Sequence, residues 1–277
     1  MRFLCLHGRG TSPEIFRIQL ASLRNHLAVS QPHTYDFLPG AYPTSPAPGI
    51  APFFPDGPYL SHFPSPPSPS GIRSALSHLS TYITQHGPYD GVLAFSQGCA
   101  LLSTFLLSLS HQHQPLPFKF AVFICGGPSL SFLEHELGIV VPEQAYEIDA
   151  RSRNELDHTA GKLETVLANP ELLSQNPGAG DYWGESARAE GSVLNQDMDM
   201  DYGVRVGEEE KIGMRTVHVI GKKDPRRWAG RCLVGLCREG EENRRVWEFE
   251  GGHEVPRKGE AGERLGGLVR WAAGEGE

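Results

Sequence analysis

Ser96 lies between a short apolar run, residues 91–95, and a helix-prone run that begins at Gln97. A buried strand that turns at once into a helix bends tightly, and such a bend can expose its serine as a nucleophile at the carboxyl end of a sheet. Small residues at Ala94 and Gly98 would let neighbouring elements approach the bend closely. The alternative is an ordinary strand-to-helix turn in which the Ser96 hydroxyl caps the helix.

Two later loops supply the groups that a serine nucleophile needs. A hydroxyl is a poor nucleophile at neutral pH, so it needs a base, and the base needs a carboxylate that fixes its tautomer. Asp224 lies four residues after an apolar strand-like run that ends at Ile220, and His253 lies four residues after Phe249, where the last expected strand ends. The order Ser96, Asp224, His253 is the one found in α/β-hydrolases. We predict that these residues form a catalytic triad, which needs no metal ion and no organic cofactor.

The remaining histidines fit the role of the base less well. His218 alternates with valines inside an apolar run, which indicates a structural residue, and His111 and His113 lie in a polar connection. His7 belongs to the loop after the first strand. Asp224 by itself could be an ordinary turn aspartate before proline, so the prediction depends on the three residues together.

Two backbone N–H groups are candidates for stabilising the negative charge that develops on an attacked carbonyl oxygen. The N–H of Gln97 stands at the start of a helix, where N–H groups have no partner within the helix and the dipole is positive. The loop His7-Gly8-Arg9-Gly10 follows the first strand, and its glycines allow close approach to a ligand. We therefore predict an oxyanion hole formed by the N–H groups of Gln97 and Arg9, against the alternative of a plain glycine turn.

Strand-like and helix-like runs alternate along the chain. This alternation predicts an α/β fold with a mainly parallel sheet and helices on both faces. A length of 277 residues fits one large domain, residues 1–277, better than two small ones. The expected strands are 2–6, 34–38, 91–95, 118–125, 215–220 and 245–249, and the expected helices are 13–27, 72–83, 97–109 and a last one that ends near 273.

Two segments interrupt this alternation. Residues 39–69 contain eleven of the twenty-two prolines, interleaved with aromatic residues, so they form either a lid over a site or a passive surface loop. The aromatic side chains favour the lid. Residues 143–211 combine weak helical periodicity with the acidic run 197–201, and they indicate a cap-like insertion or a mobile loop. The aspartates of that run indicate a solvated face rather than a metal site.

The composition argues against two classes of partner. A net charge of −8 disfavours nucleic-acid binding, which needs a basic face that neutralises phosphates. No run approaches eighteen consecutive apolar residues, and the N-terminus enters a strand directly, without a signal-peptide cleavage site. We therefore expect a cytoplasmic protein that binds neither nucleic acid nor membrane. The five cysteines, an odd number, indicate buried thiols rather than a disulfide framework.

Several blocks of the sequence resemble the fungal family of serine hydrolases, and within it the branch encoded beside polyketide synthases that includes the lovastatin-pathway thioesterase. The resemblance covers nearly the whole chain. One departure is Ala94, where the family has Gly, and residues 197–210 match no part of the family. The blocks are 7–12, 53–58, 89–98, 221–224 and 251–257, of which Phe-Ser-Gln-Gly at 95–98 and Gly-Gly-His-Glu-x-Pro at 251–256 are the most specific.

The resemblance implies a single α/β-hydrolase domain with Ser96, Asp224 and His253 as its triad. It also implies hydrolysis of an acyl ester or acyl thioester, including the release or editing of polyketide chains held by an acyl carrier protein. A general short-chain carboxylesterase and an acyltransferase or cyclase using the same triad are the alternative enzymes. A non-catalytic binding protein is the remaining class, although such proteins tend to have lost a member of the triad.

Cations flank both loops that carry the predicted base and carboxylate. On an acidic protein, a basic rim at the active-site mouth could steer an acidic carrier protein or a phosphopantetheine arm toward the serine. The alternative is that these are ordinary solvated loop charges. The cations are Lys222, Lys223, Arg226 and Arg227 near Asp224, and Arg257 and Lys258 after His253.

Overall fold

The computed structural model of the chain describes residues 1–29, 31–64, 67–168, 183–184, 187, 192–196, 202–257 and 259–275. Its centre is a six-stranded sheet in the order β2-β1-β5-β6-β7-β8, in which every neighbouring pair is parallel. The predicted mainly parallel sheet is therefore confirmed. The strands are β1 (Arg2–Leu6), β2 (Thr34–Leu38), β5 (Gly91–Phe95), β6 (Phe120–Ile124), β7 (Arg215–Gly221) and β8 (Arg244–Phe249).

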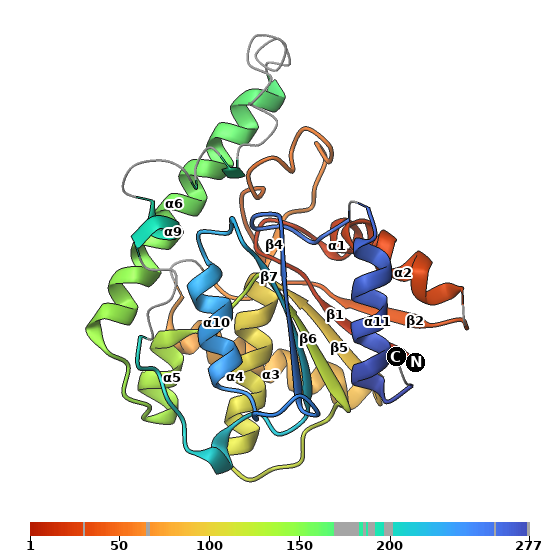
Figure 1. Ribbon diagram of the computed structural model, residues 1–277, viewed down its shortest axis with the longest axis vertical. Helices are drawn as coiled ribbons and strands as arrows, with labels where there is room; N and C mark the ends of the chain where they lie inside the picture. The colour runs from red at the N-terminus through yellow and green to blue at the C-terminus, as the bar shows by residue number, and fades with distance from the viewer. Residues whose placement is uncertain are drawn as a thin grey trace.

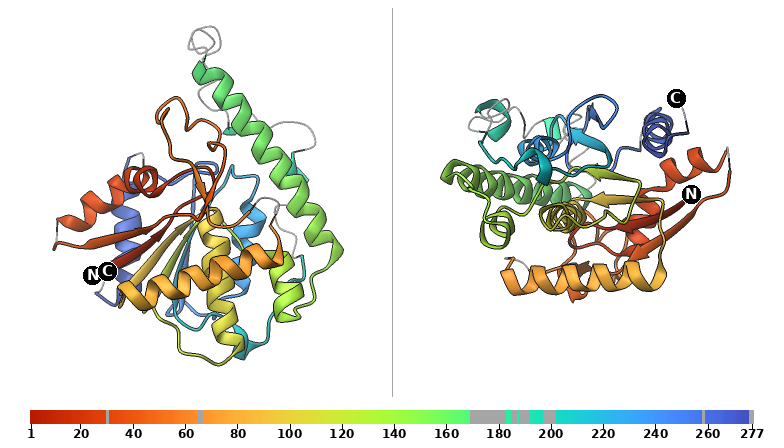
Figure 2. Two further views of the ribbon diagram at one scale, coloured as in Figure 1. Left: turned by 180° about the vertical axis from the view of Figure 1, so that it is seen from behind. Right: turned by 90° about the horizontal axis from the view of Figure 1, so that it is seen from below.

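Helices cover both faces of this sheet (Figures 1 and 2). One face carries α1 (Pro13–Gln19), α2 (Ala21–Ala28) and α11 (Ala261–Ala273), and the other carries α3 (Pro69–His86), α4 (Gln97–His111), α5 (Leu130–Leu137) and α10 (Arg227–Gly235). Successive side chains of β1 show why both faces must be covered. Phe3 and Cys5 pack in the cluster with α1, α2 and α11, whereas Leu4 and Leu6 pack in the cluster with α3 and α4. Burying one large apolar side chain contributes about 1.5–3 kcal/mol, so both layers stabilise the sheet.

The expected single helix over residues 13–27 is wrong. The chain forms α1 and α2, which meet at Leu20, where the backbone (φ −85°, ψ 5°) leaves the helical conformation. Phe16, Leu23 and Leu27 nevertheless belong to one apolar cluster. The spacing of the apolar residues therefore predicts the buried face that the two helices share. It does not predict that the helix ends at Leu20.

Segment 143–211 begins with α6 (Glu143–Ala168), a 26-residue helix, although its sequence shows only weak helical periodicity. Its buried side chains include Ala145, Ile148, Ser152 and Thr159, so small and polar residues make up part of the packed face and weaken the apolar pattern. The acidic run 197–201 lies outside the described residues. Within the described ranges, no helix is both long and apolar enough to cross a membrane. The segment also contains α9 (Val193–Gln196) and a 3₁₀ turn, η2 (Glu208–Glu210).

The proline-rich segment forms a long excursion, residues 39–64, that we call the Pro-rich loop. A short antiparallel pair, β3 (Tyr42–Pro43) and β4 (Leu60–Ser61), closes its base. The loop is also tied to the segment after β1, because the Gly10 N–H donates to the Leu60 carbonyl (2.9 Å) and the Leu60 N–H donates to the Thr11 carbonyl (2.7 Å). Both views of the ribbon show the loop beside α6, beyond one end of the sheet (Figures 1 and 2).

Candidate active site

Ser96 occupies a strained turn between β5 and α4. Its backbone lies at φ 53° and ψ −113°, a region that costs a non-glycine residue about 1–3 kcal/mol. The Ser96 N–H donates to the Ile124 carbonyl (3.0 Å), which holds the turn against β6. A Cβ atom at Gly98 would lie 2.3 Å from the Leu6 carbonyl oxygen, so this position admits only glycine. Ala94, the departure from the family pattern, is fully buried without disturbing the turn.

The structure brings together the three residues that the sequence predicts as a triad. The Nε2 atom of His253 lies 2.8 Å from Ser96 Oγ, and its Nδ1 atom lies 2.9 Å from Asp224 Oδ2. Asp224 is 1% exposed, and its other oxygen, Oδ1, accepts the backbone N–H of Arg226 (2.8 Å). An ionised carboxylate can only accept hydrogen bonds, so it selects the tautomer with the proton on Nδ1 and leaves Nε2 free to accept from Ser96.

The loop after β1 reaches the same place. An added Cβ at Gly8 would lie 3.3 Å from Ser96 Cβ, so Gly8 permits this close approach. The Gly8 carbonyl oxygen accepts hydrogen bonds from His7 Nδ1 (2.8 Å) and Thr11 Oγ1 (2.7 Å). His7 Nε2 accepts the Gly40 N–H (2.9 Å), and burial lowers the pKa of His7 to about 4, so the ring is neutral with its proton on Nδ1. Sequence reasoning treated His7 only as a loop residue and missed Thr11.

The Gln97 side chain ties the far end of the Pro-rich loop to the serine turn. Its Oε1 accepts the His62 N–H (2.9 Å), and its Nε2 donates to Ser61 Oγ (2.9 Å) and the Phe63 carbonyl (3.2 Å). His7 holds the near end of the loop through Gly40. The residues that shape the serine's surroundings thus also fix both ends of the loop. No sequence spacing predicts these contacts, because they join segments more than 30 residues apart.

Cys125 supports the loop that carries His253. Its thiol lies within hydrogen-bonding distance of the carbonyls of Gly252 (3.6 Å) and Glu254 (3.4 Å), on either side of the histidine, and its one proton can be donated to either. The backbone of Cys125 has a positive φ of 47°, and burial raises the pKa of its thiol well above the ordinary value, so the thiol stays protonated and can donate. The sequence had indicated only a buried thiol.

The two arginines that follow Asp224 fit neither the hypothesis of a basic rim nor the alternative of solvated loop charges, because both are buried in ion pairs. Arg226 is 8% exposed and pairs with Asp149 (2.7 Å), and Arg227 is 8% exposed and pairs with Glu248 (2.7 Å). Lys222 pairs with Glu250, Arg257 is exposed, and Lys258 lies outside the described residues. Arg226 therefore joins α6 to the loop of Asp224 and presents no free charge to a partner.

Two clefts meet at Ser96 and His253, which line both of them. The larger has a volume of about 600 Å³ and lies among the Pro-rich loop, α1 and α6. The smaller has a volume of about 170 Å³ and lies among the first turn of α4, residues 125–129 after β6, and α6. Clefts in which a few positioned polar groups converge are where ligands bind.

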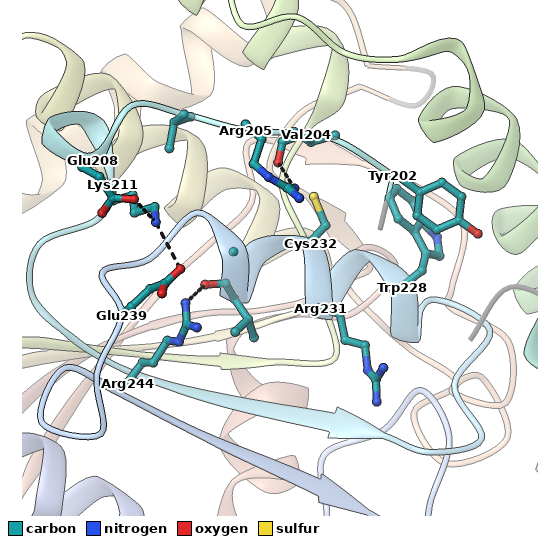
Figure 3. Close-up of a pocket in the computed structure, with 13 residues that line it drawn as sticks. Tyr202, Val204, Arg205, Glu208, Lys211, Trp228, Arg231, Cys232, Glu239 and Arg244 are labelled. Carbon is teal, nitrogen blue, oxygen red and sulfur yellow. Dashed lines mark hydrogen bonds and ion pairs between the residues drawn. The ribbon is translucent and has the colours of Figure 1, made fainter. Parts of the chain in front are cut away.

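A further cavity of about 520 Å³ lies between residues 202–211 and α10, and none of the three predicted triad residues lines it (Figure 3). Lys211 stands between Glu208 (2.5 Å) and Glu239 (3.3 Å), so these charges compensate one another. Cys232 also faces this cavity, but burial raises the pKa of its thiol to about 12. A protonated thiol is a poor nucleophile, so this cavity does not compete with the cleft at Ser96.

Because three histidines are buried, we predict that the free energy of unfolding falls as the pH is lowered. Burial lowers the pKa of His7 to about 4, that of His218 to about 3, and that of His62 well below the ordinary 6.5. As the pH falls below 6.5, the unfolded chain binds protons that the folded chain does not, so each histidine lowers the free energy of unfolding by about 1.4 kcal/mol per pH unit. For His7 this continues to about pH 4. Denaturant unfolding at pH 7, 6 and 5 measures the slope.

The control for this prediction is His218→Gln, which removes one buried titrating ring from β7 and leaves the cleft unchanged. We expect a shallower loss of stability between pH 6 and 5 than in the wild type. Equal slopes for the two proteins would contradict the assignment of the acid sensitivity to these histidines.

Comparison with known proteins gives a consistent result. A family model described as serine hydrolase (FSH1) matches residues 1–264. The chain is 30% identical over 257 residues to esterase FPY3 of Fusarium mangiferae, which covers 93% of this chain and 89% of that protein. It is 27% identical over 289 residues to esterase alnB of Emericella nidulans, with coverage of 98% and 96%.

A solved structure also shares the fold. Carboxyl esterase 2 of the mycorrhizal fungus Tuber melanosporum superposes with a TM-score of 0.50 at 14% identity, covering 99% of this chain and 77% of that one. The resemblance found in the sequence blocks is thus confirmed at the level of the family, and the α/β-hydrolase fold at the level of the architecture. With its family model matched over residues 1–264, the chain belongs to the FSH1 family of serine hydrolases.

Proposed function

We propose that this serine hydrolase cleaves acyl esters or thioesters through an acyl-enzyme on Ser96, with His253 as the base and Asp224 as the orienting carboxylate. The observation that carries the proposal is the unbroken chain of hydrogen bonds from Ser96 Oγ through both nitrogens of His253 to Asp224, with distances of 2.8 and 2.9 Å. These distances are short enough for proton transfer from a nucleophile to its base.

The reaction follows from this arrangement in two halves. Ser96 Oγ bonds to the carbonyl carbon while its proton passes to His253 Nε2, and Asp224 stabilises the charged ring. When the tetrahedral intermediate collapses, the bond to the leaving oxygen or sulfur breaks and that atom takes the proton. Water then attacks the acyl-enzyme, gives its proton to His253, and releases the acid as Ser96 regains the proton.

The N–H groups of Gln97 and Arg9 form the oxyanion hole in this proposal. His7 and Thr11 both hold the Gly8 carbonyl oxygen, and in a trans peptide the following N–H, that of Arg9, points the opposite way. Arg9 lines both clefts at Ser96, which is consistent with a donor at the reacting carbonyl. One such donor contributes about 3–4 kcal/mol to stabilising the transition state.

Thr11→Val tests this orientation of the Gly8–Arg9 peptide. The variant removes one of the two donors to the Gly8 carbonyl, so we expect kcat to fall about tenfold with little change in KM. Thr11→Ser keeps the hydroxyl and should restore kcat. A valine variant with wild-type kcat, or a serine variant as slow as the valine variant, would show that Thr11 does not position the oxyanion hole.

Labelling with a fluorophosphonate probe, followed by mass spectrometry, tests the nucleophile directly. We expect one adduct per chain, located on Ser96, and none after Ser96→Ala. Incubation with a panel of acyl esters and thioesters should trap the acyl group on the same residue. If the wild-type protein is not labelled by the fluorophosphonate, the proposal is wrong and the chain is better explained as a non-catalytic binding protein.

We also propose that residues 1–277 form a single domain and that its two insertions, the Pro-rich loop and segment 143–211, help to bind the substrate. The Pro-rich loop acts as a lid, and segment 143–211 acts as a cap through α6, since side chains of both line the larger cleft. Phe53 at the tip of the loop is 65% exposed beside that cleft, where an apolar ligand would cover it.

For the natural substrate we propose polyketide acyl groups that are released or edited from an acyl carrier protein in the cytoplasm. The support is the resemblance of the blocks at 95–98 and 251–256 to the branch encoded beside polyketide synthases. The test compares kcat/KM for acyl-carrier thioesters and for short aryl esters. Faster turnover of the aryl esters would favour the general carboxylesterase, and an acylated alcohol or a cyclised product would favour the acyltransferase or cyclase.

A further inference from the structure

Two clefts meet at Ser96, and an ion pair between α6 and the loop after β1 lines both of them. Arg9 Nη2 lies 3.9 Å from Asp157 Oδ1, and these two residues, together with Leu156, line both clefts. Ser96 and His253 also line both. A substrate whose carbonyl carbon reaches Ser96 can therefore place one half in each cleft.

The two sides differ in size. The larger cleft holds about 600 Å³ and the smaller about 170 Å³. The first cleft is thus more than three times as large as the second. A group that fills the first cleft is therefore too large for the second.

The larger side also has the more apolar surface near its mouth. Ile50, Phe53 and Phe54 of the Pro-rich loop and Val255 after His253 face it. The smaller side contains Arg153 and Arg226, which share the carboxylate of Asp149. The larger cleft thus suits a bulky apolar group, and the smaller one suits a short group that tolerates polar surroundings.

We propose that the enzyme selects esters or thioesters with one bulky apolar group and one short group. The inference rests on the proposed function, because it uses Ser96 as the point where both halves meet.

Four esters test the rule without assuming which half enters which cleft: ethyl acetate, ethyl decanoate, naphthylmethyl acetate and naphthylmethyl decanoate. We expect one of the two mixed esters to have the highest kcat/KM. Ethyl acetate should be slower because it leaves the larger cleft empty, and the doubly bulky ester should be at least tenfold slower than the better mixed ester. A doubly bulky ester hydrolysed as fast as the better mixed ester would overturn the inference.

Two matched alanine-to-leucine variants assign the clefts. Ala100, on the first turn of α4, lines only the smaller cleft, and Ala160, on α6, lines only the larger one. Ala160→Leu should lower kcat/KM for the better mixed ester at least tenfold. Ala100→Leu should lower kcat/KM at least tenfold for the version of that ester in which the short group has four carbons in place of two. Ala150→Leu, on an exposed position of α6, is the control and should follow the wild type with every ester.

The outcomes separate this inference from the proposed function. Hydrolysis of none of the four esters, with no fluorophosphonate adduct on Ser96, contradicts the proposed function and the inference with it. An adduct on Ser96 together with hydrolysis that ignores the distribution of bulk, or leucine variants with identical profiles, contradicts the inference alone.

Discussion

Ser96→Ala is expected to lower kcat about 10⁶-fold, the scale of effect when a triad nucleophile is lost. The variant removes the only atom in the proposal that bonds to the acyl carbon, and His253 is left without the proton it accepts from Ser96 Oγ at 2.8 Å. The remaining N–H groups can still polarise a carbonyl, which leaves a slow reaction with water. Steady-state hydrolysis of the better mixed ester measures the loss.

The fold should survive this change, because alanine fits wherever the serine backbone fits and the turn is held by the Ser96 N–H and by Gly98. Thermal unfolding of the variant should therefore match the wild type. Ser103→Ala is the matched control, since it removes a buried hydroxyl further along α4 that bonds only within its own helix. We expect near wild-type activity from it. A Ser96→Ala enzyme that keeps a tenth of its activity would refute the assignment of the nucleophile.

Asp224→Asn is expected to lower kcat about 10⁴-fold while leaving the fold intact. The new amide can keep the acceptor bond from the Arg226 N–H through its oxygen, which turns its NH₂ group toward His253 Nδ1. A donor at this position forces the proton of the imidazole onto Nε2. The ring then presents an N–H to Ser96 and can no longer accept its proton.

Asp90→Asn is the control for this prediction. Asp90 is a partly buried aspartate that accepts hydrogen bonds from the Arg2 N–H and from Lys119, and it lies just before β5, at the opposite end of that strand from Ser96. It should lose a little stability and no activity. An Asp224→Asn enzyme within tenfold of the wild type would mean that another group orients His253.

The sequence predicts those features that depend on local patterns. The central strands β1, β5, β6 and β7 are short, mainly apolar runs. Parallel strands bring their carboxyl ends to one edge, so the meeting of Ser96, Asp224 and His253 could be predicted from the spacing of each from its strand. The break at Leu20 could not, because both helices bury one stripe of side chains. The sequence shows only weak helical periodicity over α6 because Ser152 and Thr159 lie on its buried face, where a helical hydropathy pattern has apolar residues.

The contacts that surround the triad could not be predicted from the sequence, for a different reason. Gln97 is predicted for its backbone N–H, yet its side chain binds residues 61–63. Arg226 looks like a loop cation and instead lies buried against Asp149, 77 positions away. Such pairings depend on three-dimensional proximity between distant segments, and no local spacing encodes them.

The residues that fix the ends of the Pro-rich loop lie beside the triad, whereas the residues of the loop that line the larger cleft lie at its tip. His7 and Gln97 fix the ends of the loop at Gly40 and at residues 61–63, while its tip lines the larger cleft. Inside these anchors, Ala47 and Leu60 also bond to the segment after β1, so we expect that the tip between them can be exchanged for another of different length or composition without moving the serine turn. Changes of substrate range in this family would then arise by replacement of one loop on a constant catalytic frame, and a loop transplanted with Gly40 and Ser61 at its ends should carry its own preference with it.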